Sequence, residues 1–284
     1  MKVLVTGVKG QLGFDVVSEL KRRNIDCVGA DIEDFDITDA KSTEKFILSN
    51  SPDAVVHCAA YTNVNKAQED EELCRKINVE GTANIAAVCE SIGAKLIYIS
   101  TDYVFGGEGD LPQETDEPKA PLNVYGKTKL EGENEALRLC SRLFIVRTSW
   151  VFGKNGGNFV KTMLSLSDTK DSLNVVCDQI GSPTYTKDLA VLLCDMVKTE
   201  KYGVYHATNE NFCSWAEFAR KIMEYGNKKT VINDVKTQDY PSAAVRPLNS
   251  RLSKKSLDNA GFCRLPAWED ALERYLSEIL SAVK

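Results

Sequence analysis

Tyr125 and Lys129 stand four residues apart in the segment PLNVYGKTKLEGE, residues 121–133. On a helix, positions i and i+4 share a face, so the phenol and the ammonium can point into one cleft. A phenol has an unperturbed pKa of ~10 and transfers protons poorly near neutral pH, but a neighbouring positive charge lowers that pKa. The pair is therefore suited to acid–base chemistry, although the same spacing also arises by chance on helix surfaces.

The centre of this segment, Gly126-Lys127-Thr128, also resembles the end of a phosphate-binding P-loop. That motif needs a glycine five positions earlier, directly after a strand. Position 121 is proline and no strand precedes it, so the P-loop hypothesis is rejected. These three residues are interpreted as the first turn of a helix.

Polar side chains follow the apolar run AKLIYIS, residues 94–100, which predicts a strand. Ser100, Thr101, Asp102 and Tyr103 thus stand where a strand ends, and ligands of parallel sheets bind beyond the carboxyl ends of the strands. A hydroxyl there can hydrogen-bond a substrate carbonyl. The same residue types are also common in ordinary turns, so the interpretation depends on the other motifs around them.

A second motif, GVKGQLG at residues 7–13, spaces three glycines between a predicted strand and a predicted helix. Glycines let the backbone turn tightly and approach a pyrophosphate at a helix N-terminus, which predicts a dinucleotide site. Asp31, at the end of the next strand, can accept hydrogen bonds from an adenosine ribose and would repel the extra phosphate of NADP. Lys9 would act in the opposite direction. NAD(H) is slightly favoured, and NADP(H) stays open.

The elements that must position these residues alternate along the first half of the chain. Predicted strands cover residues 2–6, 26–30, 53–57, 94–100 and 143–148, with helical periodicity between them. This order predicts an α/β fold with a doubly wound, Rossmann-like parallel sheet. Beyond residue 150 we expect a smaller α+β lobe, with helices at 188–199, from Ser214 (a capping box with Glu217) and at 266–280. Residues 1–150, with parts of 151–205, are predicted to bind the dinucleotide, and 151–284 mainly the substrate.

The composition limits which binding partners and which cellular compartment we expect for this protein. Lys+Arg of 35 against Asp+Glu of 41 gives a net charge of −6, which offers no broad footprint for nucleic acid or an anionic membrane. The nine cysteines include no Cys-x-x-Cys pair and lie mostly in apolar runs, as expected for free thiols in a reducing compartment. No signal peptide or membrane span is apparent. We therefore expect a cytoplasmic protein without a structural zinc site.

Together, GVKGQLG, STDYVF and NVYGKTK resemble the motifs of the extended short-chain dehydrogenase/reductases. More narrowly, the chain resembles the dTDP-4-dehydrorhamnose reductases, through PDAVVHCAAYTNVNKAQ (52–68), STDYVFGGEGDLP, APLNVYGKTKLEGE and RTSWVFG. The resemblance continues in NFVKTML (158–164), DQIGSPT (178–184) and RPLNSRL (246–252), so it covers nearly the whole chain.

This resemblance implies a catalytic trio in which Thr101 holds a keto oxygen, Tyr125 protonates it, and Lys129 tunes Tyr125 and holds the nicotinamide ribose. Implied cofactor-binding positions are Gly7, Lys9, Gly10, Gln11, Leu12, Asp31, Asp36, Ile37, Ala59, Ala60, Tyr61, Asn78, Tyr125 and Lys129. Implied substrate-binding positions are Val64, Thr101, Asp102, Tyr103, Trp150, Asn158 and Arg246, with the loop 179–184. Taken alone, Trp150 could equally be a core residue and Arg246 a surface residue.

The implied activity is reduction of the 4-keto group of dTDP-4-dehydro-L-rhamnose by NAD(P)H, with the dTDP-sugar as the partner. One alternative is a related nucleotide-sugar epimerase or dehydratase, but a dehydratase should carry a second carboxylate where Tyr103 follows Asp102. Another is a non-catalytic, dinucleotide-binding regulatory subunit like that of methionine adenosyltransferase. Some family members dimerise through a metal held by acidic residues. No such cluster is assigned here, so no metal-binding residue is named, and both a metal and a homodimer stay open.

Overall fold

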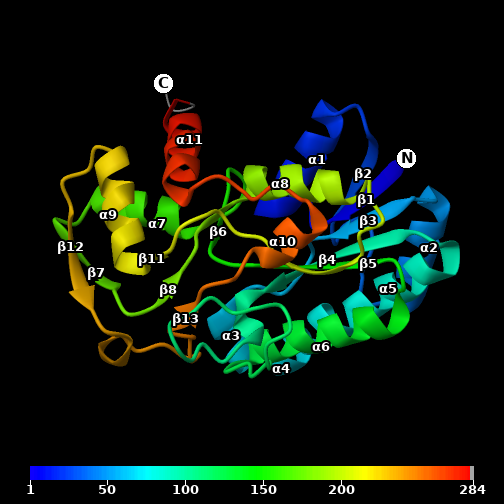
Figure 1. The fold of residues 1–284 in the computed structure, drawn as a ribbon, viewed down its shortest axis with the longest axis horizontal. Coiled ribbons are helices and arrows are strands. Elements are labelled where there is room, and N and C mark those ends of the chain that lie inside the picture. The colour runs from blue at the N-terminus through cyan, green and yellow to red at the C-terminus, as the bar shows by residue number, and fades with distance from the viewer. Residues whose placement is uncertain (282–284) are drawn as a thin grey trace.

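Six parallel strands form the central sheet of the molecule, for which the computed structural model describes residues 1–281. They are β1 (Lys2–Thr6), β2 (Asp26–Ala30), β3 (Ala54–His57), β4 (Lys95–Thr101), β5 (Leu143–Thr148) and β10 (Gly203–His206), in the spatial order β10-β5-β4-β3-β1-β2 (Figure 1). The predicted parallel α/β sheet is confirmed, and its first five strands match the sequence prediction. The short strand β10 was not predicted.

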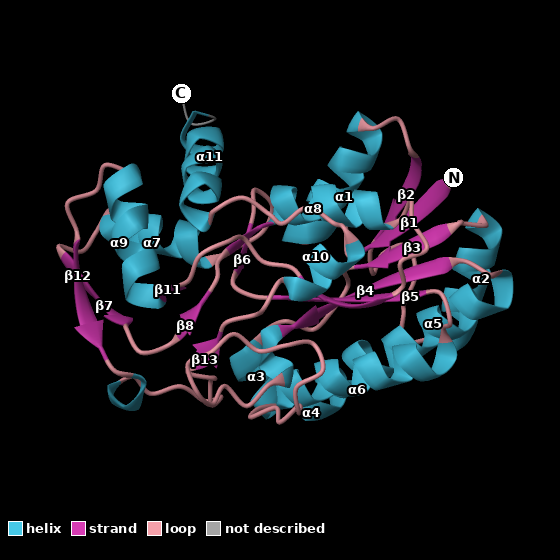
Figure 2. Ribbon diagram, in the orientation of Figure 1, coloured by secondary structure: helices cyan, strands magenta, loops and turns pink. Residues whose placement is uncertain are grey.

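Helices cover both faces of this sheet (Figure 2). On one face lie α1 (Gln11–Arg22), α8 (Thr186–Met196) and α10 (Lys255–Ala260), and on the other lie α2 (Ala40–Asn50), α5 (Gly81–Ile92) and α6 (Val124–Leu139). Alternate side chains of β1 point to opposite faces of the sheet: Val3 and Val5 pack toward α1, and Leu4 packs toward α2 and α5. Because both faces are buried, the strands read as nearly continuous apolar runs.

The winding direction of the sheet reverses beside β1. The chain runs from β1 through α1 to β2 on one side, and then returns so that β3 pairs with the opposite edge of β1. A reversal of this kind leaves a crevice at the carboxyl ends of the two strands, which is where such sheets bind ligands. The loops that follow β1 and β3 therefore lie side by side at the predicted site.

A second lobe packs beside the carboxyl ends of the strands (Figure 1). Its helices α7 (Phe159–Ser167), α9 (Trp215–Tyr225) and α11 (Trp268–Ser281) share a core with β7 (Ser172–Val176) and β12 (Val231–Val235). The predicted capping box of Ser214 and Glu217 is present at the start of α9. The remaining short elements are α3 (Val64–Glu69), α4 (Glu71–Arg75), a π-helix at Lys76–Glu80, a 3₁₀ turn at Asp102–Val104, β6 (Val151–Phe152), β8 (Ile180–Gly181), β9 (Thr184–Tyr185), β11 (Cys213–Ser214), a 3₁₀ turn at Thr237–Asp239 and β13 (Asn249–Ser250).

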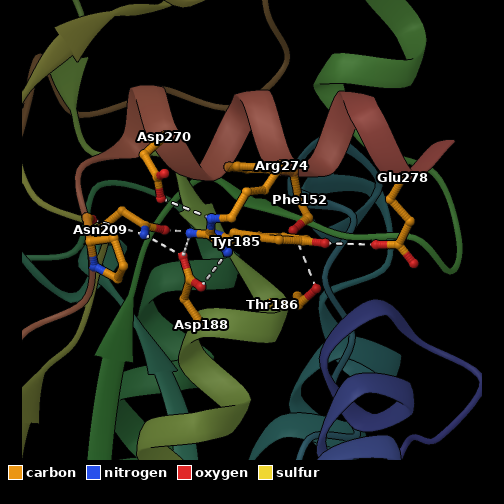
Figure 3. Close-up of polar contacts among 9 residues, drawn as sticks. Phe152, Tyr185, Thr186, Asp188, Asn209, Asp270, Arg274 and Glu278 are labelled. Carbon is orange, nitrogen blue, oxygen red and sulfur yellow. Dashed lines mark hydrogen bonds and ion pairs between the residues drawn. The ribbon is translucent and has the colours of Figure 1, made fainter. Parts of the chain in front are cut away.

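Helix α11 is joined to the start of α8 by a polar network (Figure 3). Arg274 donates two hydrogen bonds to the Asp188 carboxylate, at 2.8 and 2.7 Å. The same carboxylate accepts a bond from Asn209 at 2.8 Å, and the Tyr185 hydroxyl donates to Glu278 at 2.7 Å. A planar guanidinium paired with a carboxylate in this way fixes orientation as well as distance. The second lobe's helix α11 is thus fastened to helix α8 of the sheet.

Within residues 1–281 no helix is both long and apolar enough to cross a membrane.

Helix α6 is held to the sheet by a buried ion pair. Arg147 on β5 donates to both carboxylate oxygens of Glu133 on α6, at 2.8 and 2.7 Å, and the two side chains are 3% and 2% exposed. Ser100, on the adjacent strand β4, donates a further hydrogen bond to Glu133. Removing one partner of a buried pair leaves an uncompensated charge in the core, which costs far more than the loss of an exposed pair.

We predict that Glu133→Gln lowers the free energy of unfolding by about 3 kcal/mol, because Arg147 loses its charged partner. Urea denaturation followed by circular dichroism measures this change. The matched control is Glu135→Gln on the same helix, which removes only the solvent-exposed pair with Arg138 and should cost about 0.5 kcal/mol. Equal effects of the two substitutions would contradict the role given to the buried pair.

Candidate functional site

A cavity of about 920 Å³ opens at the carboxyl ends of the central strands and reaches the second lobe. Most of the site residues predicted from the sequence lie together in its wall. They are Gly7, Lys9, Gly10, Gln11, Leu12, Asp31, Asp36, Ile37, Ala59, Ala60, Val64, Thr101, Asp102, Tyr103, Tyr125, Lys129, Trp150 and Asn158. The sequence motifs therefore converge on one cavity.

The glycine loop forms the floor of the cavity beside β1. Gly7 has a φ of +69°, and a Cβ atom there would come within 2.7 Å of the Ala59 backbone nitrogen. Gly10 is the N-cap residue of α1 and provides no side-chain cap. The first-turn N–H groups of α1 therefore lack the side-chain acceptor that caps most helices, and such groups bind phosphate well. The observed backbone fits a pyrophosphate.

The acidic end of the cavity lies after β2. The Asp31 carboxylate accepts hydrogen bonds from the backbone nitrogens of Lys9 and Ile32, both at 2.9 Å. The Lys9 ammonium pairs with Glu33 rather than with Asp31. Opposite charges of Lys9, Asp31 and Glu33 thus lie close together after β2, where the sequence predicts an adenosine ribose.

Two predicted cofactor residues, Tyr61 and Asn78, do not line the cavity. The Tyr61 backbone nitrogen donates to Asn78 Oδ1 at 2.8 Å, and Asn78 Nδ2 donates to the Thr128 hydroxyl at 3.1 Å. Asn78 lies within the π-helical segment Lys76–Glu80 and is buried. It therefore links the loop after β3 to helix α6, which carries Tyr125 and Lys129.

Helix α6 places Tyr125 and Lys129 in the cavity wall together with Thr101. Asn123 caps the helix by accepting a hydrogen bond from the Gly126 nitrogen at 2.9 Å. A Cβ atom at Gly126 would lie 2.2 Å from the Tyr103 carbonyl oxygen, so glycine allows α6 to approach the end of β4. The Gly-Lys-Thr segment is the first turn of this helix, as predicted.

Burial dominates the acid–base properties of the trio. Burial raises the pKa of Tyr125 well above its usual value, and a hydrogen bond with Thr101 acts in the opposite direction. Burial lowers the pKa of Lys129 to about 7, although Glu133 opposes that effect. The Lys129 ammonium lies 4.0 Å from the centre of the Tyr98 ring, a cation–π contact. The site thus combines a Tyr125 phenol that stays neutral with a Lys129 ammonium that loses its proton more readily than an exposed lysine.

On the substrate side, Trp150 adopts a φ of +49° and stacks on Trp215 with 3.7 Å between the ring centres. Asn158 caps α7 and donates to Gln11 Oε1 at 3.0 Å, so it joins the second lobe to the glycine loop. Arg246 is not in the cavity wall but interacts with the Tyr103 phenol. In the loop 179–184, Gln179 is buried and bonds Thr237 at 3.1 Å, away from the cavity wall.

Trp215 also lines the cavity, and sequence reasoning did not find it. Its only local signal was the capping box at Ser214, which fixes the start of α9 but not the direction that this helix end faces. Its partner Trp150 lies 65 positions earlier in the chain. The contact arises from the packing of the second lobe and has no sequence motif.

The parallel sheet with its glycine loop, together with the hydroxyl, Tyr-x-x-x-Lys pair and second lobe, defines an extended short-chain dehydrogenase/reductase. The family model described as "RmlD substrate binding domain" matches residues 1–281. The chain belongs to this family, that of the dTDP-4-dehydrorhamnose reductases.

Individual relatives agree with this placement. The chain is 42% identical to the spore coat polysaccharide biosynthesis protein SpsK of Bacillus subtilis, over 99% of both chains. A dTDP-4-dehydrorhamnose reductase from Clostridium acetobutylicum is 39% identical, with a TM-score of 0.96 over 99% of this chain and 100% of that one. The enzyme from Bacillus anthracis, solved in complex with NADP, is 42% identical, with a TM-score of 0.95 over 98% and 99% of the two chains.

We predict that Gly7→Ala destabilises the protein by about 2 kcal/mol or more, because alanine is strained at positive φ and its Cβ would strike the Ala59 backbone. Thermal unfolding measures the loss. Gly157→Ala is the matched control in the same cavity wall, since a Cβ atom there meets nothing within 4 Å. An unchanged melting temperature for Gly7→Ala would contradict the close approach of the two loops.

Proposed function

We propose that this protein reduces the 4-keto group of dTDP-4-dehydro-L-rhamnose with a reduced nicotinamide dinucleotide and forms dTDP-L-rhamnose. The observation that carries the proposal is the convergence of Thr101, Tyr125 and Lys129 in the same cavity as the glycine loop. The names of the family's dTDP-4-dehydrorhamnose reductases support the choice of substrate.

The nicotinamide cofactor supplies the hydride when bound, and the residues of the cavity wall would hold it in place. The turn at Gly7 and the uncapped N-terminus of α1 fit the pyrophosphate. Asp31 would face the adenosine ribose and Lys129 would hold the nicotinamide ribose. Asp36, Ile37, Ala59 and Ala60 lie in the same cavity wall and would complete the cofactor side. Tyr61 and Asn78 support this side through the link between the loop after β3 and α6.

At the reacting carbon, Tyr125 donates its proton to the C4 oxygen as the hydride arrives, and Thr101 holds that oxygen. A positioned donor supports catalysis because negative charge develops on the oxygen in the transition state. Burial makes the Tyr125 phenolate costly. Lys129, whose own pKa burial lowers to about 7, would offset part of that cost in its protonated form. Tyr103 and Trp150 would contact the sugar, and Val64 and Asn158 the nucleotide side, while Arg246, which lies outside the cavity wall, would act through Tyr103.

Two other functions make different predictions. An epimerase would return the nicotinamide to its starting state, and a dehydratase would need a second carboxylate beside Asp102, where the chain has Tyr103. A regulatory subunit would bind the dinucleotide without turnover, and would not need Thr101, Tyr125 and Lys129 in one cavity.

The decisive experiment supplies the purified protein with NADH or NADPH and dTDP-4-dehydro-L-rhamnose, and follows the loss of nicotinamide absorbance. Reduction predicts stoichiometric oxidation of the cofactor and a product with the mass of dTDP-L-rhamnose. An isomeric product without net oxidation would identify an epimerase. Absence of turnover with both cofactors would reject the reductase.

We expect Tyr125→Phe to lower kcat by roughly 10²–10⁴-fold, because phenylalanine keeps the ring but cannot donate a proton. Binding of the dinucleotide, measured by fluorescence titration, should stay within about twofold of the original protein, since the phosphate cradle is untouched. A rate close to that of the original protein would remove Tyr125 from the mechanism.

The preference between NADH and NADPH depends on a local balance of charge. The slight preference for NAD(H) inferred from Asp31 is not supported by the relatives, one of which was solved with NADP. Lys9 can attract a ribose phosphate, but Glu33 already pairs with its ammonium. We therefore propose that the protein uses both cofactors, and that Lys9 leaves its ion pair with Glu33 to bind the ribose phosphate of NADPH.

Glu33→Gln should accordingly raise the ratio of kcat/KM for NADPH to that for NADH by a few-fold, because it frees Lys9 and removes a nearby negative charge. The dissociation constants of the two cofactors, measured by fluorescence, should shift in the same direction. Glu44→Gln on the exposed face of α2 is the control. A ratio that stays constant or falls would contradict the proposed role of Lys9.

We also propose that the protein acts in the cytoplasm. All nine cysteines are free thiols, and most are buried or partly buried, as expected in a reducing compartment.

A further inference from the structure

Asp102 holds a carboxyl group that the mechanism above does not use. It begins the 3₁₀ turn Asp102–Val104, is 3% exposed and lies in the cavity wall. One oxygen, Oδ1, accepts a hydrogen bond from the Thr101 hydroxyl at 3.0 Å. The other, Oδ2, is buried and has no hydrogen-bond partner among the described residues. A buried carboxylate oxygen without a partner is costly, and it needs an explanation.

The hydrogen bond from Thr101 to Asp102 conflicts with the proposed role of Thr101, which is to donate a hydrogen bond to the keto oxygen. A threonine hydroxyl has a single proton to donate. In the observed arrangement that proton points to Asp102, and the Thr101 oxygen accepts a bond from the Tyr103 backbone at 3.2 Å. A keto oxygen only accepts hydrogen bonds, so Thr101 has nothing to offer it while Asp102 is ionised.

Protonation of Asp102 removes the conflict. A neutral carboxyl group donates its own O–H to the Thr101 oxygen, which frees the Thr101 proton to point at the keto oxygen. The alcohol product has the opposite requirement, because its new O–H needs an acceptor. Thr101 provides that acceptor when its own proton is held by ionised Asp102.

We infer that Asp102 is a positioning residue whose protonation state sets the direction of the Thr101 hydrogen bond, so that neutral Asp102 selects the keto substrate and ionised Asp102 selects the alcohol. This inference rests on the proposed reductase function. It goes beyond a contact with the sugar, because Asp102 acts through Thr101.

The surroundings of Asp102 support a change of charge in the working range. Burial raises its pKa to about 6, while Ser250 on β13, Thr101 and the backbone N–H groups of Asp102 and Tyr103 favour the ionised form. Oδ2 nevertheless has no hydrogen-bond partner among the described residues. Tyr103 and, from α6, Tyr125 face the same carboxyl group, and Arg246 acts on Tyr103. Lys129 is the other group nearby in the wall whose pKa is close to neutral. The fraction of neutral Asp102 therefore falls as the pH rises through its pKa.

The first test is the pH dependence of kcat/KM for the keto sugar between pH 5.5 and 8.5. We expect a decline approaching about tenfold per pH unit above the Asp102 pKa. Asp102→Asn should abolish the decline that begins near pH 6, because an amide does not ionise, and leave only the fall above about pH 7 that loss of the Lys129 charge causes. Ser250→Ala should shift the first decline to higher pH, because it removes a group that favours the ionised form. Asp110→Asn, an exposed neighbour in the following loop, should leave it in place.

The second test is binding, which separates Asp102 from Lys129 and from turnover. By calorimetry without cofactor, the affinity for dTDP-L-rhamnose should rise with pH in the original protein and stay flat in Asp102→Asn. A flat rate profile in the original protein, or the same decline in the original, Asp102→Asn and Ser250→Ala proteins, would overturn the inference. Absence of turnover at every pH would instead reject the proposed reductase.

Discussion

The buried ion pair between Glu133 and Arg147 is the constraint on which the site depends. It ties α6 to β5, and Ser100 near the end of the neighbouring strand β4 joins it. Two glycines let the helix lie very close to its neighbours. A Cβ atom at Gly126 would lie 2.2 Å from the Tyr103 carbonyl oxygen, and one at Gly132 would lie 2.4 Å from the Asn78 carbonyl oxygen. The helix can therefore neither slide nor rotate without breaking the pair. This rigidity gives Tyr125 and Lys129 a fixed position relative to Thr101.

The same packing sets the electrostatics of the cavity. Exclusion of water disfavours charge on every ionisable group, so burial raises the pKa values of Tyr125 and Asp102 and lowers that of Lys129. The pKa values of Asp102 and Lys129, which lie far apart in water, are thereby brought close to neutrality, whereas that of Tyr125 moves further above it. No single neighbour creates this effect. It follows from the depth at which the end of β4 and the start of α6 meet.

The sequence predicted the parts of the structure that have local signals. Five strands, the helix at Tyr125 and the capping box at Ser214 follow from periodicity, glycine placement and capping chemistry. Strand β10 has four residues and no alternation or turn signal strong enough to stand out. The stacking of Trp150 on Trp215, the link from Asn78 to Thr128 and the nearness of Ser250 to Asp102 join segments that are distant in the chain. Such contacts exist only after the chain has folded, so no local pattern encodes them.

The path of the chain has a consequence for how the two lobes can be separated. After β5 the chain builds β6 to β9 in the second lobe, returns to the sheet for α8 and β10, and leaves it for α9 and β12. It comes back for α10 before ending in α11, which Arg274 fastens to Asp188 at the start of α8 (Figure 3). A cut near residue 150 would thus deprive the sheet of an edge strand and of the helix that packs on α1. Chimeras that exchange substrate lobes by joining two fragments would be incomplete on both sides, and new specificities must instead be grafted loop by loop.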